Sequence, residues 1–527
     1  MTPLTMRLKS LALLVMAGIL FAESQVDAQQ AGAPVQDAAD ELTTVIDRRI
    51  ADGWERNKIE PAPQADDSEF LRRTYLNVIG RIPSVYEVLE FLDETSPHKR
   101  RELIERLLDS PGYLSNFTAV WRDVIVPEAA SADNLLVQRS DVPRFETWLR
   151  ERLDRNDGFD RIVREVITGT TESRSEGSPL AFDRLKEGKA ENLAAGTARA
   201  FLGVRLECAQ CHNHPFAKWQ REDFWKLAAF YGDGAIGNNT STGTGGRKIM
   251  IPDTDKEVQA AFLDGSQPSA TGQVTSRAIL ANWVTAKENR YFARATVNRV
   301  WAHFFGIGIV DPVDDFDEKN PASHPELLDD LANAFLAHNY DLKFLVRAIT
   351  RSRPYQLASR RSHPSQQDPH HFARMLVKGL TSDQLFDSLI WATGNAENDN
   401  MRQGFFFRNN GQRERFRELF GQQISPPGEV QTSILQALLM LNGEFVDQAS
   451  SPERSMTLSA IIAVPFFNNE QRLETLFLAA LARPPRSDEV ALYLNYFEGE
   501  DPNQNWKQAL GDVYWALLNS SEFSLNH

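Results

Sequence analysis

The only two cysteines of the chain are separated by two residues and followed directly by a histidine, in Cys208-Ala209-Gln210-Cys211-His212. C-x-x-C-H is the spacing used to attach a c-type haem. In that chemistry the thiols of Cys208 and Cys211 add to the haem vinyl groups as thioethers, and the imidazole of His212 becomes the proximal ligand of the iron. The motif therefore predicts one covalent haem c at Cys208, Cys211 and His212.

A six-coordinate haem needs a second axial ligand on the face opposite His212. His214 follows on the same local turn, so it has no easy route to that face. Met250, His303 and His324 are the candidates for this ligand, and a five-coordinate iron is the alternative.

Two alternatives use the same cysteines. A Cys208–Cys211 disulfide closes a small ring and stabilises little, because the entropic effect of a disulfide grows with loop length; no alternating β-α-β pattern supports a thioredoxin-like redox role. Zinc would take Cys208, Cys211 and either His212 or His214, but structural zinc normally uses two separated ligand pairs, and the chain has no second pair of cysteines. Both alternatives stay open beside haem.

Residues 1–28 have the layout of a secretory signal peptide. Arg7 and Lys9 precede an apolar run over 11–22, and Val26-Asp27-Ala28 offers a small-residue cleavage site. The run is shorter than the roughly 20 residues that a spanning helix needs. We expect an exported protein, periplasmic or extracellular, with no stable membrane insertion after signal cleavage. Haem attachment to C-x-x-C-H takes place in the same compartment.

The formal net charge of −15 argues against nucleic acid as a partner and fits a soluble protein that docks on another protein. A redox partner protein would follow from the predicted haem rather than from the charge, and the oligomeric state stays unknown. No G-x-S-x-G, H-E-x-x-H or Gly-rich phosphate loop is present, so no enzyme class is assigned. A hydrolase acting on exported polymers has only the acidic residues in its favour.

Four aspartates lie close together between Asp311 and Asp317. Such a cluster could bind calcium, which takes several oxygen ligands, but the spacing matches no EF-hand loop. A turn with capping aspartates explains the cluster without an ion.

The residue pattern predicts a mainly α, multi-helix, two-lobed fold, because apolar residues recur at helical spacing and strand-type alternation is scarce. A helix over 194–206 is expected to run into Cys208, and a second one to begin near Gln220. Aromatic residues flank the motif and could wall a porphyrin or belong to the core: Phe216, Trp219, Phe224 and Trp225.

Breaks rich in Gly, Asn, Ser and Thr suggest the domain edges. The predicted division is a signal peptide over 1–28, a disordered tether over 29–37, an N-terminal helical domain over 38–231, a loop-rich or β insert over 232–272 and a C-terminal helical domain over 273–527.

An internal repeat joins the two ends of the chain. Residues 75–92 (YLNVIGRIPSVYEVLEFL) align without a gap with residues 477–494 (FLAALARPPRSDEVALYL). Arg81, Glu87 and their counterparts Arg483 and Glu489 are among the matches. Each copy is followed by a helix with a similar tail, Leu-Leu-Asp-Ser or Leu-Leu-Asn-Ser. The repeat predicts helical hairpins at both ends, which we interpret as scaffold.

The segments FLRRTYLNVIGRIPSVYEVLEFL, RRELIERLLDSPGY and FLGVRLECAQCHNHPFAKWQREDFWKLAAFY resemble the planctomycete cytochrome-type domain, domain of unknown function 1549. The segments YFARATVNRVWAHFFGIGIVDPVDDF, NPASHPELLDDLANAF, ILQALLMLNGEF and LFLAALARPP resemble its usual companion, domain of unknown function 1553. The resemblance implies export and a c-type haem at Cys208, Cys211 and His212, but no known reaction. Larger relatives carry a separate cytochrome c domain, which this chain lacks, so electron transfer between two haems of one chain is not expected.

Overall fold

A computed structural model describes residues 33–130, 140–170, 177–232, 247–268, 274–394, 413, 416, 450–497 and 506–527; side chains are described from residue 38 onward, except at 128 and 130. The predicted signal peptide lies outside these residues. Helix α2 begins at Ala33, so the last part of the predicted tether over 29–37 is helical.

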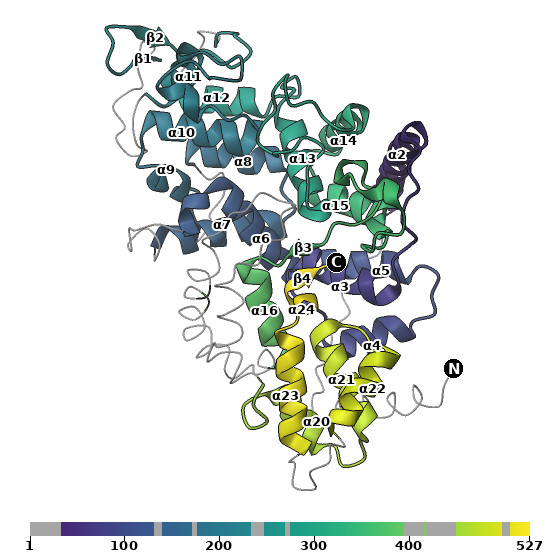
Figure 1. Cartoon of the computed structure of the whole chain (residues 1–527). Coiled ribbons are helices and arrows are strands. Elements are labelled where there is room, and N and C mark those ends of the chain that lie inside the picture. The colour runs from purple at the N-terminus through teal and green to yellow at the C-terminus, as the bar shows by residue number, and fades with distance from the viewer. Residues whose placement is uncertain are drawn as a thin grey trace.

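The described chain is mainly helical, as the sequence predicts (Figure 1). The helices before the insert are α2 (Ala33–Asn57), α3 (Asp67–Ile79), α4 (Val85–Asp93), α5 (Lys99–Leu108), α6 (Pro111–Ile125), α7 (Val142–Asp154), α8 (Phe159–Thr168), α9 (Ala181–Leu185), α10 (Ala190–Thr197) and α11 (Arg221–Ala228). Those after it are α12 (Ser276–Val284), α13 (Phe292–Phe305), α14 (Pro325–Ala337), α15 (Leu342–Arg351), α16 (Ser382–Ala392), α20 (Met456–Ala463), α21 (Asn469–Leu481), α22 (Ser487–Phe497), α23 (Trp506–Leu518) and α24 (Ser521–Ser524).

Short helical turns and two small sheets complete the fold. The turns are η2 (Pro127–Ala130), the π turn η4 (Ala198–Leu202), η5 (Glu207–Gln210), η6 (Ala229–Tyr231), η7 (Pro354–Gln356), η8 (Pro364–Gln366) and η9 (Pro369–His371). Strands β1 (Lys248–Met250) and β2 (Glu257–Gln259) form an antiparallel hairpin inside the predicted insert. Strands β3 (Lys378–Gly379) and β4 (Leu525–Asn526) pair antiparallel and join the last described residues to the middle of the chain.

No described helix combines the length and the apolar character that crossing a membrane requires.

The molecule has two lobes, each with its own hydrophobic core, and the lobes do not follow the predicted domain boundary. The first core takes buried side chains from α2 as far as Met375, together with Leu478 and Ala482, so α12 to α15 belong to it. The second core takes residues from α16 onward, and its helices form the lower lobe in Figure 1. The predicted division near the insert over 232–272 thus lies inside the first lobe, where α8 packs on α12.

The predicted repeat is present as two helix–turn–helix units. Helices α3 and α4 form the first unit, and α21 and α22 form the second. Leu76 of the first unit lies in the second core, while its counterpart Leu478 lies in the first core. Each unit thus places a leucine in the core of the other lobe, a reciprocal arrangement like that at an interface between two-fold related subunits. The two units therefore join the lobes to one another.

Candidate functional site

The segment that precedes Cys208 is not the single helix that the sequence predicts over 194–206. Helix α10 passes into the π turn η4, which ends at Gly203 with a φ of +66°. A Cβ at Gly203 would lie 2.7 Å from the ring of Phe316, so both the backbone conformation and the close approach require glycine. The prediction was wrong here because a packing contact from a distant loop ends the helix early. The short turn η5 then carries Cys208.

The backbone of the motif is anchored while its thiols face solvent. Ala209, between the cysteines, is fully buried, and its N–H donates to the carbonyl of Leu206 over 2.9 Å. Cys208 and Cys211 are exposed and are not joined by a disulfide. Both thiols are therefore accessible to a reactive group from outside.

Helix α11 fixes the motif from the side, and its start near Gln220 confirms the prediction. The carbonyl of Gln210 accepts hydrogen bonds from Trp225 Nε1 (3.0 Å) and from Arg221 Nε (3.3 Å). Arg221 Nη2 also donates to the carbonyl of Pro252, over 2.7 Å, at the turn of the β1–β2 hairpin. Arg221 thus ties the motif to the hairpin, a role that only its place at the start of α11 could have suggested.

The imidazole of His212 is exposed and held in one orientation. Its Nδ1 lies 2.8 Å from the carbonyl oxygen of Asn213. A carbonyl can only accept, so Nδ1 carries the proton and Nε2 keeps its lone pair. This is the tautomer in which a histidine coordinates a metal through Nε2 while its other nitrogen is held by a backbone carbonyl.

His214 has a different role. Its Nδ1 accepts the backbone N–H groups of Ala217 (2.8 Å) and Phe216 (3.3 Å). The backbone N–H of His214 donates to the carbonyl of Trp219 over 2.8 Å. The side chain therefore closes the turn after the motif.

The aromatic residues around the motif divide into core and surface. Trp219, Phe224 and Trp225 are buried members of the first core. Phe216 is 74% exposed. Three of the four candidate wall residues thus build the protein interior, and Phe216 alone of this set presents its ring to solvent.

The candidates for a second axial ligand lie in different surroundings. Met250, on β1, is 51% exposed. His303 is buried against Phe117, with Nε2 2.8 Å from the carbonyl of Asn77, and burial lowers its pKa to about 4. Burial also lowers the pKa of His324 to about 4. Of the three, Met250 is the one on the hairpin that Arg221 ties to the motif.

One of the four aspartates between residues 311 and 317, Asp314, forms ion pairs. Asp314 is buried and accepts hydrogen bonds from Arg199 Nε (2.9 Å) and Arg205 Nε (2.8 Å). Burial opposes ionisation of Asp314, but these arginines lower its pKa. These hydrogen bonds fasten the loop between α13 and α14 to Arg199 and Arg205, which lie on either side of Gly203 in the chain. Asp314 is thus committed to arginines rather than left open as an oxygen ligand for calcium.

The motif presents groups that thioether attachment would use and that zinc could share. Accessible thiols and a free Nε2 are the groups that covalent haem attachment uses. Among the described residues, no three His, Cys, Asp or Glu side chains lie close enough together to hold a metal ion. Zinc at Cys208, Cys211 and a histidine would require rearrangement of the turn.

Comparison with known protein families gave two matches. Residues 45–235 match the family described as protein of unknown function (DUF1549), and residues 276–497 match the family described as protein of unknown function (DUF1553). The C-x-x-C-H motif lies in the first match and the loop around Asp314 in the second. No curated protein and no solved structure matched the chain.

Proposed function

We propose that this chain, which belongs to the families DUF1549 and DUF1553 arranged in tandem, is an exported c-type-cytochrome-like protein that binds one covalent haem and acts in electron transfer. The observation that carries the proposal is the motif itself: two accessible thiols beside an imidazole whose Nδ1 is bonded to the carbonyl of Asn213.

The residues of the chain would divide the work. Cys208 and Cys211 hold the group covalently, and His212 offers Nε2 as the proximal ligand. Arg221 and Trp225 keep the carbonyl of Gln210, and with it the spacing of the thiols, in place. A haem bound there would supply one-electron redox chemistry.

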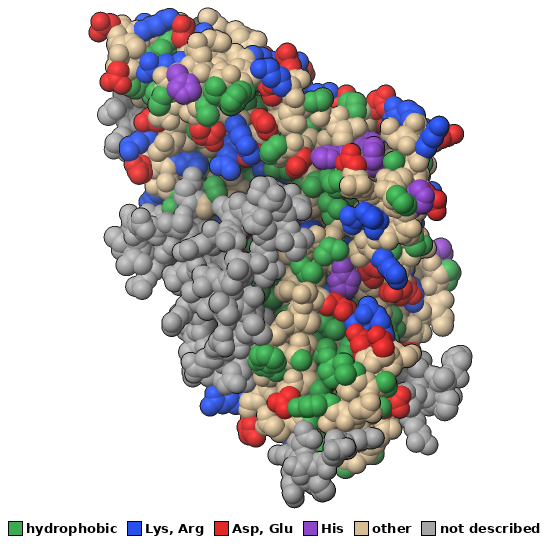
Figure 2. Space-filling view, viewed as in Figure 1, with side chains coloured by type: hydrophobic (Ala, Val, Ile, Leu, Met, Phe, Trp, Pro, Cys, Tyr) green, Lys and Arg blue, Asp and Glu red, His purple; other side chains and the backbone are tan. Residues whose placement is uncertain are grey.

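The exposure of the motif favours transfer to another protein. Both cysteines and His212 lie at the surface. On the face shown in Figure 2, basic and acidic side chains are interspersed rather than gathered in one large patch. A redox partner would then recognise the immediate surroundings of the motif, including the exposed ring of Phe216.

The deciding measurement is the pyridine haemochrome spectrum of the full chain, made in a host with haem-attachment machinery. We expect one haem per chain, retained after denaturation. Each single variant, Cys208→Ser or Cys211→Ser, should keep only one of the two thioethers. The double variant should hold no covalent haem. His212→Ala should alter the spectrum, while His370→Ala, a matched exposed histidine outside the motif, should leave it unchanged. Colourless protein with two titratable thiols would overturn the proposal.

A haem-free scaffold or binding module is the second candidate, with a Cys208–Cys211 disulfide or a metal site. The observation that favours it is the burial of Trp219, Phe224 and Trp225, which leaves few apolar side chains to wall a porphyrin. Thiol titration and elemental analysis of the same preparation separate the cases: a disulfide gives no free thiol, zinc gives zinc without iron, and haem gives iron.

A further inference from the structure

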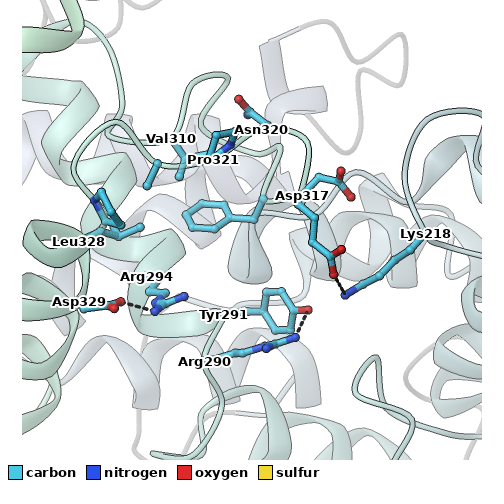
Figure 3. Close-up of a pocket in the computed structure, with 14 residues that line it drawn as sticks. Lys218, Arg290, Tyr291, Arg294, Val310, Asp317, Asn320, Pro321, Leu328 and Asp329 are labelled. Atoms are coloured by element: carbon cyan, nitrogen blue, oxygen red, sulfur yellow. Dashed lines mark hydrogen bonds and ion pairs between the residues drawn. The ribbon is translucent and has the colours of Figure 1, made fainter.

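A pocket of about 290 Å³ opens between the segment after the C-x-x-C-H motif and the start of α13 and α14 (Figure 3). Apart from Asp317, its lining residues had no chemistry assigned to them by the sequence patterns. Lys218 reaches it from one side, while Arg290 and Tyr291, just before α13, reach it from another. The proposed haem chemistry uses none of these residues.

The floor of the pocket is apolar. Val310 and Leu328 are buried beneath it, and the rings of Phe316 and Tyr291 are partly exposed within it. Phe316 is fixed from behind, because its N–H donates to the carbonyl of Gly203 over 2.9 Å. Rigid aromatic faces of this kind bind the C–H faces of a flat or ring-shaped ligand.

The rim of the pocket carries equal numbers of cations and carboxylates. Lys218 Nζ lies 3.4 Å from Glu318 Oε1, and Arg294 is paired with Asp329. Within each pair, the positive and the negative charge cancel.

Two further groups of opposite charge remain on the rim. Arg290 donates to Tyr291 Oη over 3.3 Å and, among the described residues, has no carboxylate within ion-pair distance. Asp317 Oδ1 accepts the N–H of Lys319. In Figure 3 the ring of Tyr291 lies between Arg290 and Asp317.

This balance selects against a charged ligand. An anion would gain from Arg290 but would face Asp317 and Glu318, and a cation would meet the reverse arrangement. A neutral ligand with many hydroxyl groups gains from both sets, since each hydroxyl donates to a carboxylate and accepts from a guanidinium or ammonium group. We propose that this pocket binds a ring of a neutral oligosaccharide, with the sugar face on the aromatic floor and its hydroxyls on the charged rim.

A second cavity indicates that the ligand is longer than one ring. A space of about 540 Å³ between α11 and the β1–β2 hairpin shares Lys218 with the first pocket. Trp219 and Phe262 line it, together with acidic and basic side chains. The pKa of Arg290 is raised mainly by its bond to Tyr291, and the charges of Glu318 and of Asp264, which lines this second cavity, add to the effect. The next rings of the oligosaccharide would extend past Lys218 into this cavity.

Calorimetric titration of the full chain with cello-, manno-, xylo-, laminari- and maltohexaose tests the proposal. We expect at least one hexasaccharide to bind, and its monosaccharide to bind more weakly. Arg290→Ala and Glu318→Ala should each weaken that binding about fivefold or more, because each removes a hydrogen bond that involves a charged group. Lys287→Ala, an exposed cation outside the pocket, should leave it unchanged.

Comparison of Arg290→Ala with Glu318→Ala distinguishes a neutral ligand from an anionic one. For an anionic ligand, Glu318→Ala would strengthen binding rather than weaken it. Leucine serves as the probe for a zwitterion, and binding of leucine without any sugar overturns the proposal. So does the absence of sugar binding, or binding that both variants leave intact. The Cys208→Ser/Cys211→Ser chain should bind sugar as the wild type does, which keeps this result independent of haem.

Discussion

The two copies of the helix–turn–helix unit have the same skeleton and different surroundings. Arg81 donates to Glu87 over 2.8 and 2.9 Å, and Arg483 donates to Glu489 over 2.7 and 2.8 Å. The guanidinium of Arg81 lies over the ring of Tyr75, 5.4 Å from its centroid; that of Arg483 lies over Phe477 at 5.3 Å. The same turn is thus built twice from the same pair of charges.

The copies differ in what lies on the far side of the arginine. The ring centroid of Trp391 is 3.6 Å from the guanidinium of Arg81. Arg483 instead meets a second carboxylate, Glu522, at 2.6 Å. A partly buried arginine can therefore be stabilised by an aromatic face or by an acid, because both stabilise positive charge.

A second difference lies in helix α3. Arg72 is fully buried and donates to the carbonyls of Ala480 (3.1 Å), Glu522 (3.2 Å) and Phe523 (2.8 Å). Its counterpart in α21 is Glu474, whose pKa is raised by burial. Arg72 of the first copy thus donates to the carbonyl of Ala480 in the second copy, which has Glu474 at the equivalent position. The interface between the two copies is therefore asymmetric, although the sequence is repeated.

The largest expected effect follows from that difference. Arg72→Leu removes three hydrogen bonds and leaves buried carbonyls without a donor, so unfolding should become easier by about 4 kcal/mol. Glu474→Gln, at the same repeat position, should change stability by about 0.5 kcal/mol at most. Denaturant unfolding, followed by tryptophan fluorescence, measures both. Equal effects would show that Arg72 does not hold the lobes together.

The arginines of the two turns should come next. Arg483→Ala removes the hydrogen-bonded cation of Glu489 and Glu522, leaves Glu489 only Arg486 at 3.6 Å among the described cations, and should cost about 3 kcal/mol. Arg81→Ala leaves one carboxylate, Glu87, and should cost about 2 kcal/mol. Unfolding at pH 7 gives both values. Arg486→Ala, which removes a more exposed cation 3.6 Å from Glu489, is the comparison and should cost less than either. A larger loss at Arg81 would mean that the Trp391 contact outweighs the second acid.

The pH dependence of these variants gives a separate test. Burial opposes ionisation of Glu87, Glu489 and Glu522, but their arginines lower the pKa of each. A carboxylate with a lowered folded pKa adds stability above its unfolded pKa of about 4.3, and that stability is lost as the pH falls through the folded value. The gap between wild type and Arg483→Ala should therefore narrow in acid, and by more than the gap for Arg81→Ala. A gap that does not change with pH would contradict the assignment.

The first turn has glycine where the second has alanine. Gly80 has a φ of +78° and Ala482 a φ of +58°. A Cβ at Gly80 would lie 2.7 Å from Asn116 Oδ1, so Gly80→Ala should cost about 2 kcal/mol through strain and this clash. Ala482→Gly relieves left-handed strain but loses a buried methyl group, and should stay within about 0.5 kcal/mol of wild type. Thermal unfolding compares them, and a cost at Ala482 equal to that at Gly80 would refute the strain argument.

The sequence predicted that the two turns would be alike, because a repeated sequence preserves interactions between residues that are close in the chain. The matched Arg, Pro and Glu all act within one turn, so their spacing carries the geometry. Helical periodicity likewise predicted the mainly α fold and the start of α11. Both signals depend on neighbours a few positions apart.

Interactions between distant segments left no such signal. The early end of the helix before Cys208 depends on Phe316, more than a hundred positions further along the chain. The lobe boundary depends on α12 to α15 packing against the first core, although their sequence resembles the second family. The pocket at Arg290 and Tyr291 is lined by the same loop that Asp314 ties to Arg199 and Arg205.

The smallest effect concerns the serines that end the repeated tails. Ser110 Oγ accepts the N–H of Tyr113 and donates to the carbonyl of Leu107, and Ser520 makes the same two bonds with Phe523 and Leu517. Ser110 caps the long helix α6, whereas Ser520 caps the single turn α24. Ser110→Ala should cost about 1 kcal/mol and Ser520→Ala about 0.5 kcal/mol, since fewer helical residues depend on the second cap. Thermal unfolding of both, with Ser110→Thr and Ser520→Thr as variants that keep the hydroxyl, distinguishes a lost cap from altered packing; an equal loss in the Thr variants would assign the effect to packing.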